Sequence, residues 1–100
     1  MVRHLFLWRV APDADPDEIV AILNTLPEKI DNVRSWEIGR HQGDPGDSGD
    51  PWHYALIADF DSFEALQQYS DHPYHLEVVE QLLPRFSARA VVDFERAEDD

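Results

Sequence analysis

The chain opens with Val2-Arg-His-Leu-Phe-Leu-Trp-Arg-Val10, and this stretch decides how the rest of the fold must be arranged. Its alternation predicts a β-strand with His4, Phe6, Trp8 and Val10 on one face and Leu5 and Leu7 on the other. A strand that is apolar on both faces suits a central position in a sheet that is covered on both sides. The fold therefore needs a cover on each side of this strand.

Length and composition predict one globular domain. The 100 residues are 43 % apolar, which is enough for one modest core. We expect the domain to span residues 1–95, and we expect the acidic tail, residues 96–100, to be disordered. The chain has no cysteine, which excludes disulfides, thiolate catalysis and cysteine-bound metals.

The charge balance is strongly acidic. The net charge is −13 at pH 7, and such a charge repels phosphate backbones, so no nucleic-acid partner is expected. The acidic residues gather at the ends and in loops, which fits ordinary solvated segments; a halophile-type acidic surface is the alternative. The N-terminus lacks a signal-peptide pattern, and no apolar run approaches the roughly 20 residues of a membrane span. We therefore expect a soluble cytoplasmic protein with no membrane partner.

Two capping patterns mark the starts of helices. Asp15-Pro16-Asp17-Glu18 combines a capping aspartate, a proline at the first helical position and a glutamate three residues after the cap. The helix that it starts has apolar residues at helical spacing up to Ile30, and Pro27 is expected to stop or kink it. Asp61-Ser-Phe-Glu64 is a second capping box and starts another helix.

Three further strands follow from the alternation. They are expected at residues 33–42, at residues 52–60, and from 85 or 87 to 95. The first of them alternates weakly, as an edge strand does, whereas the second is apolar on both faces. The loop from Gly43 to Pro51 has neither the Lys-Ser/Thr pair of a phosphate loop nor the spacing of a calcium loop, so it is assigned no ligand.

The order β-α-β-β-α-β is that of an α+β, ferredoxin-like fold with an antiparallel four-stranded sheet. Its two βαβ crossovers place both helices on one face of the sheet. The other face would expose Leu5, Leu7 and their neighbours as a large apolar patch, which monomers rarely tolerate. We therefore expect a homodimer held by sheet-to-sheet packing, in which each buried aromatic contributes about 1.5–3 kcal/mol.

A polar cluster, Tyr69-Ser-Asp-His-Pro-Tyr-His75, interrupts the second helical pattern. His75 is the best acid–base candidate because an ordinary histidine titrates near about pH 6.5. The hydroxyl of Tyr69 could orient His75 or stabilise an enolate. His4 would line the same pocket as His75 if its face of the first strand meets the helices. The alternative is that His4 is an ordinary core histidine whose hydrogen bonds are satisfied. His72 is most simply a helix cap, and a metal site from His72 and His75 lacks an acidic third ligand.

Four stretches carry a family resemblance. They are Val2-Arg-His-Leu5, Phe60-Asp-Ser-Phe-Glu-Ala-Leu66, the Tyr69-x-x-His72-Pro73-x-His75 motif and Val91-Val92-Asp93-Phe94. Together they resemble the stress-responsive A/B barrel family (Dabb, dimeric α/β barrel), over nearly the whole chain. The resemblance implies a homodimer whose sheets form a barrel, with a pocket between each sheet and its helices.

Within that family, the chain is similar to polyketide cyclases of the olivetolic acid cyclase type, which need no metal or organic cofactor. The resemblance implies a catalytic histidine at His75, a partner tyrosine at Tyr69 and a further pocket histidine at His4. It aligns Leu23 with a pocket tyrosine of the cyclases, so one polar group is lost in this chain. The residues expected to bind substrate are Phe6, Trp8, Leu23 and His72.

Two classes of function remain open. In the first, the protein is a cofactor-independent cyclase, isomerase or lyase that acts on a polyketide-like carbonyl compound without a metal. In the second, it is a non-catalytic stress-response or ligand-binding dimer whose pocket holds a small apolar or aromatic ligand. Related dimeric monooxygenases share the architecture but need other motif residues. A pocket that holds an aromatic ligand, with His75 and Tyr69 facing it, would favour the enzyme.

Overall fold

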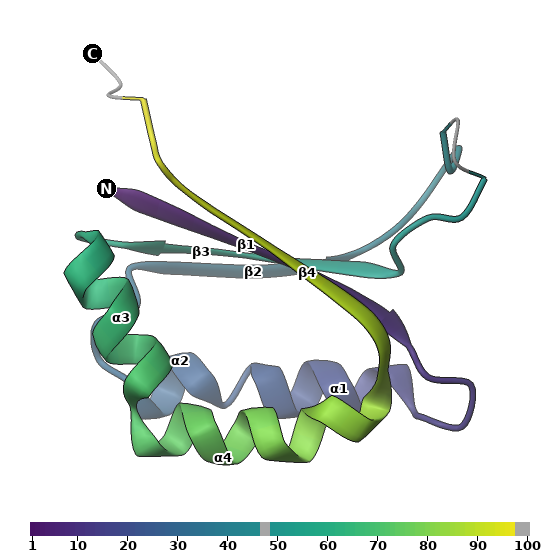
Figure 1. Cartoon of the computed structure of the whole chain (residues 1–100), viewed down its shortest axis with the longest axis horizontal. Helices are drawn as coiled ribbons and strands as arrows, with labels where there is room; N and C mark the ends of the chain where they lie inside the picture. The colour runs from purple at the N-terminus through teal and green to yellow at the C-terminus, as the bar shows by residue number, and fades with distance from the viewer. Residues whose placement is uncertain (47–48, 98–100) are drawn as a thin grey trace.

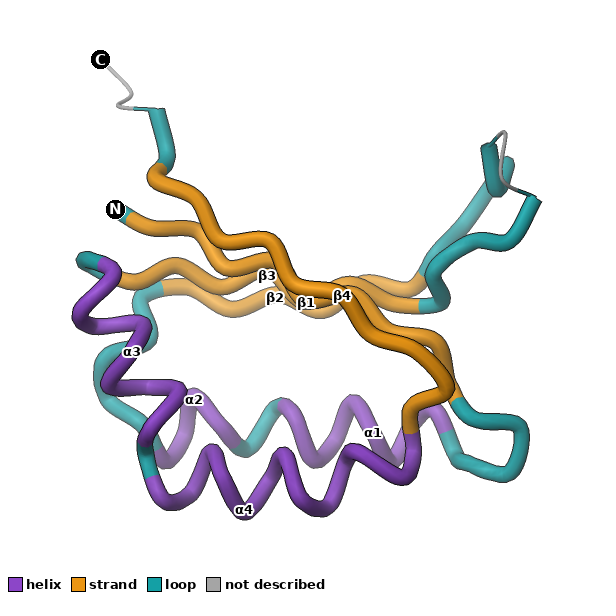
Figure 2. The backbone as a smooth tube through the Cα atoms, viewed as in Figure 1, coloured by secondary structure: helices purple, strands orange, loops and turns teal. Residues whose placement is uncertain are grey.

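One antiparallel sheet, with all the helices on one of its faces, makes up the computed structural model, which describes residues 1–46 and 49–97 (Figures 1 and 2). The elements run β1 (Val2–Val10), α1 (Pro16–Leu23), α2 (Leu26–Lys29), β2 (Ser35–Arg40), β3 (Tyr54–Phe60), α3 (Phe63–Asp71), α4 (Pro73–Leu82), a 3₁₀ turn η1 (Leu83–Arg85) and β4 (Phe86–Glu95). The four strands lie in the order β2-β3-β1-β4. The predicted ferredoxin-like fold is therefore confirmed, with β1 and β3 in the centre and β2 at an edge.

The first helical region is divided into α1 and α2, and Pro27, which was expected to stop or kink the helix, lies in the first turn of α2. Asp15 caps α1 by accepting a hydrogen bond from the Asp17 N–H at 2.9 Å, as predicted. α1 ends at Leu23, because its carbonyl would need the N–H that Pro27 lacks. The hydroxyl of Thr25 also donates to the Ile22 carbonyl at 2.6 Å, which competes with the helical ladder. The chain then starts again as α2.

Both predicted capping boxes were partly wrong. The Glu18 side chain does not accept from the backbone N–H of Asp15, as a capping box requires. It accepts a hydrogen bond from Arg85 at 2.8 Å instead. The cap of α3 is Ser62, whose hydroxyl accepts from the Ala65 N–H at 3.1 Å, and not Asp61. Asp61 instead pairs with Arg34 at 2.8 Å, so a long-range charge partner replaces the local cap.

The hydrophobic core lies between the helices and the sheet. Trp8 and Phe60 from the two central strands and Ile19 and Leu26 from the helices are fully buried. Trp8 stacks on Tyr54 with ring centroids 5.4 Å apart, in agreement with the pairing of these two residues across β1 and β3. This face therefore holds the inward row of β1 that includes His4.

Among residues 1–46 and 49–97, no helix covers the other face of the sheet (Figure 2). Leu5 and Ile57 pair across the two central strands on this face, and Val92 and Phe94 continue it on β4 with 53 % and 40 % of their surface exposed. The predicted apolar row on this face is therefore present.

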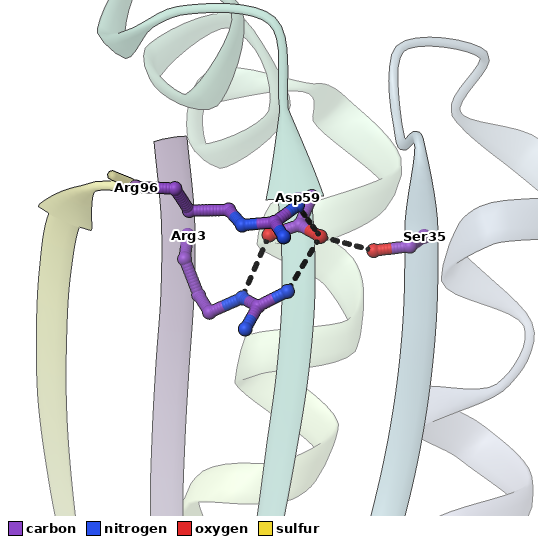
Figure 3. A network of polar contacts seen from close by, with 4 residues as sticks. All are labelled: Arg3, Ser35, Asp59 and Arg96. Carbon is purple, nitrogen blue, oxygen red and sulfur yellow. Dashed lines mark hydrogen bonds and ion pairs between the residues drawn. The ribbon is translucent and has the colours of Figure 1, made fainter. Parts of the chain in front are cut away.

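A buried carboxylate lies at one end of this open face (Figure 3). Asp59 is only 3 % exposed. It accepts hydrogen bonds from Arg3 at 3.0 and 3.1 Å, from the Ser35 hydroxyl at 2.7 Å and from Arg96 at 3.3 Å. The Arg3 guanidinium is the main cause that lowers the pKa of Asp59 below its ordinary value. The carboxylate is therefore charged and fully engaged.

The C-terminal tail was expected to be disordered from residue 96. Arg96 is held, because its N–H donates to the Met1 carbonyl at 2.9 Å and its side chain reaches Asp59. The rest of this prediction falls largely on residues 98–100, which lie outside the described residues. In the described part of the chain, no helix has the length and apolar character needed to cross a bilayer.

Candidate active site

A break between α3 and α4 brings the polar cluster together. The backbone of His72 is extended (φ −59°, ψ 134°), as expected for a residue before proline. The side chain of His72 caps α4 by accepting from the Tyr74 N–H through Nδ1 at 3.0 Å. Because the chain changes direction here, Tyr69 at the end of α3 and His75 in the first turn of α4 face each other, with ring centroids 4.6 Å apart.

These two residues line a cavity of about 230 Å³ between the helices and the sheet. The wall is largely apolar. It is formed by His4, Phe6, Leu23, Leu26, Leu56, Tyr69, Ser70, His75, Val78, Val79, Leu82, Leu83, Phe86, Arg89, Val91 and Asp93. Drug-sized ligands usually occupy cavities of roughly 300–1,000 Å³, so this one suits a smaller molecule.

Burial sets the protonation of the two central side chains in the direction that proton transfer needs. It lowers the pKa of His75 below its ordinary value, so the imidazole is neutral at neutral pH and can accept a proton. Burial also raises the pKa of Tyr69, which is 2 % exposed, so its hydroxyl stays protonated and can donate a hydrogen bond. Nδ1 of His75 is buried and makes no hydrogen bond of ordinary geometry among the described residues. The backbone of Ser70 lies near the imidazole and partly opposes the lowering of the His75 pKa by burial.

His4 reaches the same cavity from β1. Its Nδ1–H donates to a carboxylate oxygen of Asp93, its partner across β1 and β4. This bond orients the imidazole and leaves Nε2 as the atom available for a further contact. The His4 and Tyr69 rings meet edge to face with centroids 6.4 Å apart. Three side chains that can exchange or donate protons therefore surround one apolar space.

The structure places five of the seven predicted site residues around this cavity. They are His4, Phe6, Leu23, Tyr69 and His75. Trp8 is fully buried in the core beyond it, and His72 caps α4 outside the lining. Sequence reasoning missed Asp93 and Arg89, which share a face of β4. Alternation alone could group these two residues but could not say which face meets the helices.

A larger hollow of about 630 Å³ lies on the open face of the sheet, beside the loop between β2 and β3. Its wall includes Leu7, Ile57 and Trp52, and the Arg9 guanidinium stacks 4.1 Å from the centroid of the Trp52 ring. Its histidine, His41, is exposed at the rim. We take the smaller cavity as the candidate site because the buried Tyr69 and the partly buried His4 and His75 converge there, whereas the histidine of the larger hollow is exposed.

Comparison with known proteins agrees with this architecture. The sequence profile of the stress-responsive A/B barrel domain (Dabb) matches residues 2–96. The chain therefore belongs to the stress-responsive A/B barrel family. No sequence among curated proteins matches it.

Solved structures with the same fold cover almost the whole chain. The protein At3g17210 from Arabidopsis thaliana has a TM-score of 0.88 at 19 % identity, with 100 % of this chain and 99 % of that chain covered. A dimeric ferredoxin-like protein of unknown function from Thermobifida fusca is 27 % identical, with a TM-score of 0.74 and coverage of 93 % and 88 %. Hydroxynitrile lyase from Passiflora edulis has a TM-score of 0.84 at 20 % identity, with coverage of 99 % and 95 %. These likenesses define the fold, and the neighbours include dimeric proteins and a lyase.

Proposed function

We propose that this protein is a homodimeric, cofactor-independent lyase, isomerase or cyclase that acts on a small carbonyl compound by acid–base chemistry. The observation that carries the proposal is the contact between His75 and Tyr69, with ring centroids 4.6 Å apart, on the wall of an apolar cavity. The size of the cavity favours a substrate with one ring or a short chain over an extended polyketide thioester.

In the proposed step, a ring nitrogen of His75 removes a proton from the carbon beside the substrate carbonyl. The electron pair of that C–H bond moves onto the carbonyl oxygen to form an enolate, which the Tyr69 hydroxyl stabilises by donating a hydrogen bond. The enolate carbon then takes a proton back or attacks a second carbonyl of the same molecule. In a lyase version, His75 takes the hydroxyl proton of a cyanohydrin, the carbon–cyanide bond breaks, and cyanide leaves with the electron pair.

The dimer is part of the proposal because the open face of the sheet needs a cover. Val92 and Phe94 present large apolar groups to solvent on this face, beside the partly buried Leu5 and Ile57. The Thermobifida fusca neighbour is described as dimeric. We expect sedimentation at micromolar concentration to give a dimer and Phe94→Glu to give a monomer. A monomeric wild-type protein would contradict this assembly.

The activity can be tested without knowing the natural substrate. Benzylacetone carries exchangeable protons beside its carbonyl, and their replacement by deuterium in D₂O is followed by proton NMR. We expect the wild type to accelerate this exchange, and we expect His75→Ala to reduce the acceleration by about 10²–10⁴-fold. His41→Ala is the matched control, since His41 is exposed and lies outside the cavity. Mandelonitrile cleavage, read as benzaldehyde absorbance, tests the lyase version with the same variants.

The two readings of the cavity give different outcomes. Full activity in a folded His75→Ala variant would refute the catalytic role of this histidine. Binding of benzylacetone without any exchange or cleavage above the buffer rate would favour the alternative, a non-catalytic ligand-binding dimer.

A further inference from the structure

We propose that Arg89 makes the candidate site selective for a carbonyl compound that carries a carboxylate at the end remote from the carbonyl. The proposal rests on the proposed function only for the position of the carbonyl beside His75. The juxtaposition that supports it is an arginine that lines the same cavity as the two histidines and Tyr69.

The pairing of the strands places Arg89 on the helix-covered side of the sheet. Arg89 pairs with Trp8 and Asp93 pairs with His4 across β1 and β4, so both β4 residues share the face of the inward row of β1. They are four residues apart in a strand, which separates their Cα atoms by about 13 Å. A ligand that reaches from His75 and His4 to Arg89 is therefore an elongated molecule with its charge away from the reacting carbon.

Arg89 differs from most arginines of this chain in that it has no charged or hydrogen-bonding partner in the part of the chain that the structure describes. Arg3, Arg34 and Arg85 each bind a carboxylate of the protein within 3.1 Å. For Arg89, no hydrogen bond or ion pair is found within residues 1–46 and 49–97. It is also the only cationic side chain among the described residues that line this cavity. A guanidinium with free donors binds a carboxylate through two parallel hydrogen bonds.

The overall charge of the protein makes this position more informative. A net charge of −13 repels anionic ligands from most of the surface. Asp93 also lines the cavity, and its carboxylate is engaged by His4. An anionic substrate therefore needs a local cation, and Arg89 supplies it at the exposed edge strand without the cost of burying a charge. The competing explanation is that Arg89 only keeps this edge strand from pairing with other chains.

The test compares two ligands of nearly the same size, one anionic and one neutral. They are benzylacetone with a para-carboxylate on its ring and benzylacetone with a para-carboxamide, which has nearly the same shape. Binding is measured by isothermal titration calorimetry at low salt for the wild type, Arg89→Gln and Arg40→Gln. Arg40 is the matched control, because it is exposed, makes no ion pair within the described chain and lies outside the cavity.

We expect the wild type to bind the carboxylate about tenfold more tightly than the carboxamide, as one charge-assisted contact allows. Arg89→Gln should lose this preference, Arg40→Gln should keep it, and added salt should weaken it. Equal affinities in the wild type, a preference that survives in Arg89→Gln, or no binding of either ligand at millimolar concentration would overturn the proposal.

The readout separates this proposal from the catalytic one. His75→Ala should keep the preference for the carboxylate even though it loses proton exchange. A wild type that prefers the carboxylate but catalyses no exchange would support the role of Arg89 and refute the proposed reaction. Exchange without any preference would do the reverse.

Discussion

The two faces of the sheet both bury ionisable groups, but they satisfy them differently. On the open face, Asp59 accepts from Arg3, Ser35 and Arg96, so its charge is fully compensated. On the helix-covered face, Nδ1 of His75 is buried without a partner in the described chain, beside a cavity. The first arrangement stabilises the fold, whereas the second places a partly buried imidazole on the wall of an apolar cavity. This difference, rather than burial alone, separates the structural cluster from the candidate site.

The largest expected effect that tests the difference between the two faces is a change in the free energy of unfolding. Asp59→Ala leaves Arg3 and Arg96 at the sheet end without their carboxylate. We expect it to lower the free energy of unfolding by about 2 kcal/mol, because these partly exposed arginines can partly rehydrate. His75→Ala should cost less, since it removes an unpaired nitrogen along with its packing. Urea unfolding at one fixed protein concentration measures both.

The exposed Asp61 provides the control for this experiment. Its pairing with Arg34 is at the surface, so Asp61→Ala should change stability little. If His75→Ala destabilised the protein more than Asp59→Ala, the distinction between the two faces would be wrong.

The second expected effect concerns Tyr69. Tyr69→Phe keeps the packing of its ring against Phe60 and His75 and removes only the hydroxyl. We expect proton exchange on benzylacetone to slow by about 10–100-fold, below the effect of removing an ideal oxyanion donor, with little change in the unfolding midpoint. An unchanged exchange rate would remove Tyr69 from the mechanism and leave it as core packing.

The two faces should also respond to acid in separate pH ranges. Burial lowers the pKa of His75 below 6.5, so as the pH falls through that value the unfolded chain takes up a proton that the folded chain does not. Stability is then lost below about pH 6.5, and His75→Ala should flatten this part of the profile. The Arg3 guanidinium lowers the pKa of Asp59, so its contribution persists to about pH 4 and is lost below that, as the pH falls through the folded pKa.

Urea unfolding across this pH range distinguishes the two contributions. Identical profiles for the wild type and His75→Ala between about pH 7 and pH 5 would contradict a neutral, buried His75.

The smallest expected effect sharpens the role of α3 in holding Tyr69. Ser62→Ala removes the hydroxyl that accepts from the Ala65 N–H, and we expect a loss of about 1 kcal/mol in the free energy of unfolding. Circular dichroism during thermal unfolding measures it, with Asp61→Ala as the neighbouring control. A larger loss in the Asp61 variant would mean that the cap predicted from sequence is the one that matters.

Local sequence signals were reliable where one neighbour decides the outcome. Asp15 and Pro16 start a helix as predicted, and the extended backbone of His72 follows from the proline after it. The predicted capping roles were wrong where a distant arginine competed for the carboxylate. Glu18 binds Arg85 and Asp61 binds Arg34 instead. The alternation of β1 and the compact Tyr69–His75 cluster made His4, Tyr69 and His75 candidate site residues, and the family resemblance supplied their expected roles. The β4 wall of the cavity was not predicted, because the register of an edge strand depends on its partner.

The sequence by itself determined the order of elements, the central place of β1 and the break that turns Tyr69 toward His75. These features depend on alternation, on proline and on capping, which act over a few residues. Only the tertiary structure decided that Asp93 orients His4, that Arg89 faces the cavity and that Nδ1 of His75 lacks a partner among the described residues. Each of these depends on strands and helices far apart in the chain meeting in one register, which no local pattern specifies.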